Sequence, residues 1–354
     1  MVTFVRQLLV VCARRSGDAR AERDRRVAAA ASLALAVLAA SALCAAAPAA
    51  AATLTLELSR PAVVYGDAVV AHGVVDPAIE GQEVVLTYGG ADLGTTLTDA
   101  SGAFSFEFTP SRSGEVAVRL SADGSVSAPL PLTVRPGVKV THGKLIPFLR
   151  ARFALQVAPA AYDGRVTARV FHRGRRVATV RGRVRDGRAV LLVPLRGIEW
   201  FSVRFALEET AAFGSRGVKK SVKLEWRKLS VGSTGLRVKG LLTQLKRLRI
   251  RTPDTGTRFT RAVADAVVCF QKTYRLSRDY VMNENDWRKL DGAALVKPRY
   301  ATPARHIEID KARQILMLVH DRAVLGIVPV STGATGNTPD GAFRILRKNP
   351  MSCT

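Results

Sequence analysis

Few residues in this sequence are of the types that perform chemistry, and they are scattered. Of the four cysteines, Cys12 and Cys44 lie in an N-terminal basic and apolar segment, so the body of the chain holds Cys269 and Cys353. Two isolated cysteines provide neither a disulfide framework nor the spacing of a metal site. Three histidines are equally isolated: His72, His142 and His172. With no glycine-rich nucleotide loop either, the sequence predicts no metal and no cofactor.

Positive charge is the strongest feature of the composition, but it is unevenly divided. The 354 residues include 54 Lys and Arg against 29 Asp and Glu, a net charge of +25. Residues 53–135 hold 4 basic and 10 acidic residues (4 − 10 = −6), whereas residues 136–230 hold 21 basic and 6 acidic (21 − 6 = +15). Genomic Arg bias would act on both segments alike, so the contrast favours a functional attraction to polyanions.

A basic stripe is expected within the second segment. Arg181, Arg183 and Arg185 alternate with other residues, which on a strand places them on one face. The plain interpretation is a solvated outer face, and the functional one is contact with anionic wall polymers or lipid head groups. Nucleic acid is not expected, because no aromatic residues interleave for base stacking.

The N-terminal segment has the pattern of an export signal. Seven arginines fall within residues 1–26, and an uncharged run from Val27 to Ala47 follows, ending in small residues. This order predicts a signal peptide within residues 1–52, cleaved near Ala50–Ala52. An uncleaved membrane anchor is the alternative, because the apolar run is long. Either way the body is expected outside the cytoplasm, in the cell envelope.

Alternating apolar and polar residues dominate the next two segments. Residues 53–135 and 136–228 each show short runs of this kind separated by Gly, Asp and Ser turns, for example at 84–88 and 166–170. Short alternating strands at regular turn spacing favour β-sandwiches. The first segment resembles bacterial immunoglobulin-like modules, and the expected fold is therefore two all-β immunoglobulin-like sandwiches.

Residues 229–295 change to helical spacing and predict three short helices. A Gly-x-x-Gly entry, an Ala-Val-x-x-Phe-Gln helix and a Trp-x-x-Leu end resemble a peptidoglycan-binding module of the three-helix type. Its markers here are Gly232, Gly235, Val238, Leu245, Phe270, Gln271, Trp287 and Leu290. The resemblance implies peptidoglycan as a partner. The apolar markers are expected in the core, so they locate the module without identifying its binding surface.

Residues 300–354 return to strand patterns, with strands expected at 307–310, 315–319, 323–330 and 341–345. An Ile-x-Ile-Asp start, a Val-Ser-Thr-Gly turn and a Thr-Pro-x-Gly-x-Phe segment resemble the opening of an L,D-transpeptidase catalytic domain. The markers are Ser331, Gly333, Thr338, Pro339 and Gly341. The resemblance implies roughly the first third of that all-β domain.

The resemblance also implies a chemistry, namely acyl transfer between peptidoglycan stem peptides through a cysteine thiolate, a histidine base and backbone oxyanion donors. The family carries these groups in a His-Gly segment and a Ser-His-Gly-Cys-x-Arg segment, and neither is in this sequence. Cys353 has no histidine after it, and His306 and His320 lie outside any matching motif. No catalytic residue is assigned, and the chain as written is expected to be inactive.

Two hypotheses follow from these segments. In the first, the sequence is a truncated L,D-transpeptidase-family enzyme that crosslinks peptidoglycan. In the second, it is a non-catalytic peptidoglycan-binding protein of the cell envelope, with two β spacers and a helical binding module.

Overall fold

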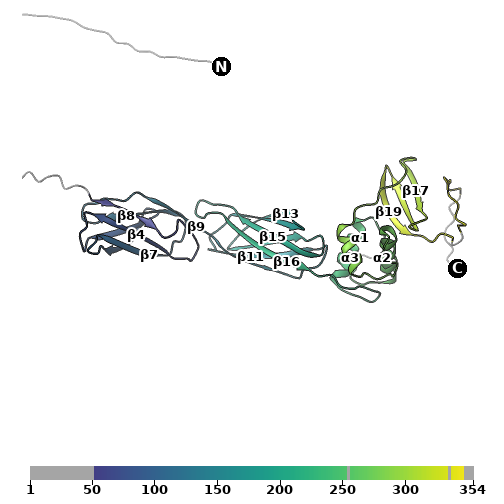
Figure 1. The fold of residues 1–354 in the computed structure, drawn as a ribbon, viewed down its shortest axis with the longest axis horizontal. Helices are drawn as coiled ribbons and strands as arrows, with labels where there is room; N and C mark the ends of the chain where they lie inside the picture. Colours follow the sequence, from purple (N-terminus) through teal and green to yellow (C-terminus); the bar gives the residue numbers. More distant parts are fainter. Residues whose placement is uncertain (1–51, 253–255, 334–335, 347–354) are drawn as a thin grey trace, which may run out of the picture. The chain divides into compact units, whose positions relative to one another are not determined.

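The computed structural model describes residues 52–252, 256–333 and 336–346. The proposed export segment and Cys353 lie outside them. In the described residues β-strands dominate and three helices occur, as the sequence predicts (Figure 1).

The first pair of sheets forms a β-sandwich over residues 53–135. One sheet has the order β1-β4-β2, with β7 also paired to β4, and the other has the order β3-β9-β8-β5-β6. Its strands are β1 (Thr53–Leu54), β2 (Glu57–Leu58), β3 (Ala62–Val64), β4 (Val69–Asp76), β5 (Glu83–Tyr88), β6 (Ala91–Leu97), β7 (Ala103–Phe108), β8 (Gly114–Leu120) and β9 (Leu130–Arg135). The inward positions of β4 and β8, such as Val69 and Val116, are fully buried.

The second pair of sheets spans residues 137–224. A three-stranded sheet β10-β11-β14 faces a four-stranded sheet β13-β12-β15-β16. The strands are β10 (Gly137–His142), β11 (Arg150–Ala158), β12 (Arg165–His172), β13 (Arg175–Arg183), β14 (Arg188–Pro194), β15 (Glu199–Leu207) and β16 (Arg216–Leu224). Phe153, Phe201 and Phe205 fill the space between these sheets. Strict alternation along β15 leaves every second side chain facing outward.

Three helices follow: α1 (Leu236–Arg247), α2 (Arg261–Tyr274) and α3 (Glu284–Gly292). Thr260 caps α2 by accepting a hydrogen bond from the Val263 N–H. Asn283 and Asp286 form a reciprocal capping box at the start of α3. The buried faces of the three helices meet in one hydrophobic cluster that includes Trp287.

The last sheet is β17 (Arg305–Asp310), β18 (Ile315–His320) and β19 (Ala323–Pro329), paired in that order. Ile315, Met317 and Ile327 belong to the same hydrophobic cluster as the helices. The expected strand at 341–345 is wrong, because this segment pairs with none of the described strands and its side chains are largely exposed. A strand needs a neighbour to satisfy its backbone groups, and apolar alternation alone does not supply one.

Candidate functional site

The Gly-x-x-Gly entry forms a tight loop at the start of α1. Gly232 and Gly235 have φ values of 94° and 111°, a region that side-chain-bearing residues rarely adopt. The Gly232 N–H donates to the Phe259 carbonyl and the Gly235 N–H to the Thr257 carbonyl. The motif therefore serves to pin the loop before α1 onto the loop before α2.

The remaining helical markers lie in the core. The fully buried markers are Val238, Leu245, Phe270, Gln271, Trp287 and Leu290. Trp287 also donates its indole N–H to the Arg227 carbonyl at 2.8 Å and stacks on Phe148 with 6.0 Å between ring centroids. These residues hold the helices together and fasten them to the preceding chain. None of the buried markers presents a side chain to a ligand.

Gln271 is the polar hub of the helices. Its amide nitrogen donates to the Asp279 carboxylate at 2.6 Å and to the Val281 carbonyl at 3.0 Å. Its amide oxygen accepts from the N–H groups of Asp279 and Tyr280. One buried side chain thus organises the loop between α2 and α3, and a buried amide with both ends satisfied is costly to replace.

The only cysteine among the described residues is unsuited to nucleophilic chemistry. Cys269 is buried in the middle of α2, and that burial raises the pKa of its thiol to about 12. A thiol acts as a nucleophile through its thiolate, which this environment suppresses.

The transpeptidase-like markers lie in the exposed segment after β19. Thr338 accepts a hydrogen bond from the Gly333 N–H at 3.1 Å through its hydroxyl, while its carbonyl accepts from Lys311 at 2.6 Å. Lys311 also pairs with Asp340 at 3.0 Å. Ser331, Pro339 and Gly341 are exposed. The segment is thus tied back to the end of β17, but these contacts assemble no nucleophile and base.

His306 has a structural role rather than the surroundings of a free base. Its Nε2 lies 3.1 Å from Glu308 and its Nδ1 2.6 Å from the Pro303 carbonyl. Burial raises the pKa of Glu308, but hydrogen bonds from the backbone N–H groups of Arg299 and Tyr300, with His306, outweigh it and lower the pKa overall. The pair anchors the start of β17.

The outward side of the sheet β13-β12-β15-β16 is densely cationic, and we call it the basic face. It comprises Arg165, Arg169, Arg181, Arg183, Arg204, Lys219 and Lys223, all exposed. Arg165 lies directly opposite Arg183, and Arg204 lies between Arg169 and Lys219 on neighbouring strands. Like charges directly opposite one another are destabilising.

Few acidic side chains neutralise the positive charge of the basic face. Among the described residues, the one ion pair that involves it joins Arg183 to Asp163 at 3.1 Å, and both side chains are exposed. Exposed Trp200 lies opposite Lys223 on the same face. Two members of the expected stripe, Arg181 and Arg183, are in this set, whereas Arg185 falls just beyond β13. The sequence pattern along one strand could not identify the members on β12, β15 and β16.

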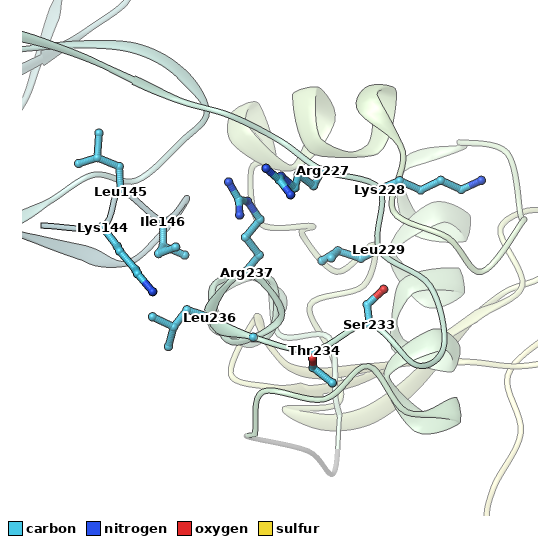
Figure 2. Close-up of a pocket in the computed structure, with 11 residues that line it drawn as sticks. Lys144, Leu145, Ile146, Arg227, Lys228, Leu229, Ser233, Thr234, Leu236 and Arg237 are labelled. Carbon is cyan, nitrogen blue, oxygen red and sulfur yellow. The ribbon is translucent and has the colours of Figure 1, made fainter.

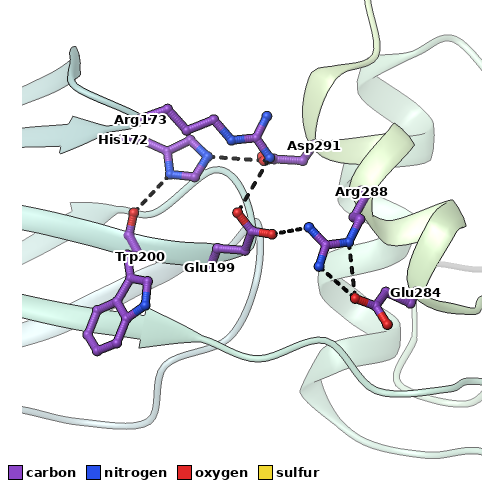
Figure 3. Close-up of polar contacts among 7 residues, drawn as sticks. All are labelled: His172, Arg173, Glu199, Trp200, Glu284, Arg288 and Asp291. Atoms are coloured by element: carbon purple, nitrogen blue, oxygen red, sulfur yellow. Dashed lines mark hydrogen bonds and ion pairs between the residues drawn. The ribbon is translucent and has the colours of Figure 1, made fainter.

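A polar network joins the second pair of sheets to α3 (Figure 3). The Asp291 carboxylate, almost fully buried, lies 3.0 Å from His172 Nε2 and 2.9 Å from Arg173. Glu199 pairs with both Arg173 and Arg288. His172 therefore has a hydrogen-bond partner, Asp291, although the two residues are 119 positions apart in the chain.

Two further properties concern the described residues as a whole. No group of three or more His, Cys, Asp or Glu side chains within them could hold a metal ion. None of the helices in this part of the chain is long and apolar enough to cross a membrane.

Comparisons with known proteins yield partial structural likenesses. No family model matches the sequence, and no curated protein matches it either. An L,D-transpeptidase from Xylanimonas cellulosilytica DSM 15894 is 30% identical, over 32% of this chain and 55% of that one, with a TM-score of 0.30. The chain thus spans about half the length of that structure. A two-domain fibronectin type III segment of chicken tenascin is 13% identical over 48% of this chain and 97% of that one (TM-score 0.32), and the D0-D1 domain of intimin is 11% identical over 48% and 98% (TM-score 0.21).

Proposed function

We propose that this chain is a cell-envelope protein of the L,D-transpeptidase family whose described residues bind peptidoglycan and support the start of the catalytic domain. The markers of residues 229–295 and 331–341 motivate the proposal. One structural observation supports it most, namely the way in which the helices and the last sheet are joined.

The join lies at Ile327 on β19. Its N–H donates to the Arg249 carbonyl at 2.7 Å, and its carbonyl accepts from the Arg251 N–H at 3.0 Å. Close by, Lys272 on α2 donates to the Val330 carbonyl at 2.9 Å. Strand β19, which leads into the Ser331–Gly341 segment, is thus held directly by the helical module. A module that binds the wall would thereby position the sheet on its substrate, and such positioning lowers the entropic cost of reaction.

Wall retention tests the binding part of the proposal. The full chain is mixed with purified peptidoglycan freed of covalently attached polymers, and the sedimented fraction is measured at low salt. Retention is expected, and its complete absence would contradict the proposal. An exported immunoglobulin-like protein without a helical module is a suitable negative control.

The chemical part is tested by incubating the same chain with a stem-peptide donor and searching for a thioester by mass spectrometry. The buried Cys269 should remain unmodified, because its raised pKa suppresses the thiolate. A thioester on any cysteine of this chain would show that it is active as written.

The basic face favours a second candidate function, the binding of an anionic wall polymer. Its uncompensated cations would gain from a polyanion, and such binding weakens with salt because exposed charges are screened. Replacing Arg169 and Arg204 by Gln should reduce retention on polymer-bearing walls several-fold at low salt. The matched control is Arg60→Gln with Arg112→Gln in the first pair of sheets, and equal losses in both variants would remove the basic face from consideration.

A further inference from the structure

A cavity of about 580 Å³ lies between the second pair of sheets and the start of α1 (Figure 2). One wall is the loop before β11, and the other comes from the chain that leads into α1. The lining residues are Lys144, Leu145, Ile146, Arg227, Lys228, Leu229, Ser233, Thr234, Gly235, Leu236 and Arg237.

The charge of this cavity is entirely positive. Four of its described lining residues are cationic and none is acidic. No carboxylate in the described part of the chain forms an ion pair with Lys144, Arg227, Lys228 or Arg237. Arg237 donates its Nε–H to the Glu225 carbonyl at 3.4 Å, which leaves its terminal NH2 groups for another acceptor.

Two guanidinium groups dominate the cavity. Figure 2 shows the Arg227 and Arg237 side chains directed into the space beside Leu145 and Ile146, whereas Lys228 extends away from it. Burial lowers the pKa of Arg237, the positive charge of Arg227 lowers it further, and Glu225 offsets this in part. Arg227 and Arg237 carry like charges close together, and Arg237 is partly desolvated. An anion that binds between the two guanidinium groups would therefore stabilise both.

The chemistry of the walls selects among anions. Arginine forks match a carboxylate or a phosphate group with two parallel hydrogen bonds, so the rest of the lining has to distinguish the two. Beside them, Leu145, Ile146 and Leu236 provide an apolar surface that suits small aliphatic side chains. A phosphodiester polymer has no such groups to place there. The combination fits a short peptide that ends in, or carries, a carboxylate next to an alanine-sized side chain.

We propose that this cavity binds a carboxylate of a peptidoglycan stem peptide, with Arg227 and Arg237 as its principal ligands and Lys144 closing the site from the opposite wall. The identification of the peptide as a stem peptide rests on the proposed function. The site exists because α1 packs closely on the loop that carries Lys144, so the second pair of sheets contributes to binding and is more than a spacer.

Calorimetric titration of the full chain with a soluble disaccharide-tetrapeptide tests the proposal. The same ligand with its carboxylates amidated is the matched comparison. Amidation should weaken binding at least about tenfold, which corresponds to about 1.4 kcal/mol. Arg237→Gln and Arg227→Gln should each weaken binding of the free-carboxylate ligand by a similar factor, whereas Lys239→Gln, an exposed cation on the same helix but outside the cavity, should change it less than twofold.

A third variant, Lys144→Gln, keeps the test valid if the arginine variants misfold. Lys144 is exposed on the other wall, so its replacement should leave the structure intact and weaken binding several-fold. Equal binding of the free and amidated ligands, or unchanged binding in Arg237→Gln and Lys144→Gln, would overturn the proposal. Wall retention distinguishes failure of the cavity proposal from failure of the proposed function. If the chain is retained on peptidoglycan while these variants bind the soluble ligand normally, the cavity is the wrong site and the proposed function stands. If the chain is not retained at all, the proposed function itself fails.

Discussion

Replacing Gly240 by Ala tests whether α1 is packed against the second pair of sheets, because that packing decides whether the free energy of unfolding falls or rises. A Cβ atom added at Gly240 would lie 2.3 Å from the Pro147 carbonyl oxygen. Carbon and oxygen in contact normally lie about 3.3 Å or more apart, so about 1 Å of separation must open. Overpacking of this kind costs about 1–3 kcal/mol.

In an isolated helix the same change would have the opposite effect. Ala in place of Gly in a helix interior stabilises by about 0.5–1 kcal/mol. The packed arrangement therefore predicts that Gly240→Ala lowers the free energy of unfolding by up to about 2.5 kcal/mol, after the helical gain is subtracted. Gly292→Ala in α3, where an added Cβ meets nothing within 4 Å, is the matched control and should be neutral or slightly stabilising.

The assay is urea unfolding followed by tryptophan fluorescence. Trp287 is fully buried against Phe148, so its exposure reports the loss of this packing, whereas Trp200 is already 61% exposed. The urea midpoint should fall for Gly240→Ala and not for Gly292→Ala, with unchanged slopes. An increase in midpoint for Gly240→Ala equal to that of the control would refute the packing of α1 against the Pro147 loop, and with it the cavity.

Four other outcomes are expected. Asp291→Ala should lower the free energy of unfolding by about 2–3 kcal/mol, because His172 loses a charge-assisted hydrogen bond. Asp265 is an exposed carboxylate in α2, and Asp265→Ala should lower it by less than about 0.5 kcal/mol. Equal losses for the two variants in urea unfolding would contradict the role of the network. Gln271→Ala should lower the free energy of unfolding by about 1–3 kcal/mol, because the partly buried N–H groups of Asp279 and Tyr280 lose their acceptor, and the loop after α2 should then exchange its amide hydrogens faster. Glu308 has a pKa below its ordinary value of 4.5, so its contribution is present above that pH and is lost as the pH falls through the folded-state pKa; a wild-type loss of stability below pH 4.5 that persists undiminished in Glu308→Gln would count against this. Cys269 should resist alkylation at pH 8 until the chain unfolds, since a pKa of about 12 leaves on the order of 0.01% thiolate.

Local pattern explains how much of the fold could be predicted. The alternation at 84–88 and 166–170 appears as β5 and β12, and the helical spacing around Leu241, Val267 and Trp287 appears as α1, α2 and α3. Side-chain periodicity is a property of a single element, so the sequence carries it without knowledge of neighbours. The segment at 341–345 had the pattern but not the pairing, and that prediction was wrong.

The candidate sites were less accessible from the sequence. The helical markers were recognisable, and their burial was expected, yet none of them lines the cavity except Gly235. The three arginines of the expected stripe lie close together in the chain, but only the strand order adds Arg169 and Arg204 to the same surface. Likewise, His172 looked isolated because Asp291 is 119 residues away.

The sequence alone allowed us to predict the three helices, most of the strands and the uneven division of charge. Tertiary structure alone decided which cations become neighbours, which buried carboxylate meets His172, and that Lys144 and Arg237 face one cavity. The physical reason is separation along the chain: periodicity and turn chemistry act within a few residues, whereas strand register and the close approach of α1 at Gly240 bring together residues tens to more than a hundred positions apart.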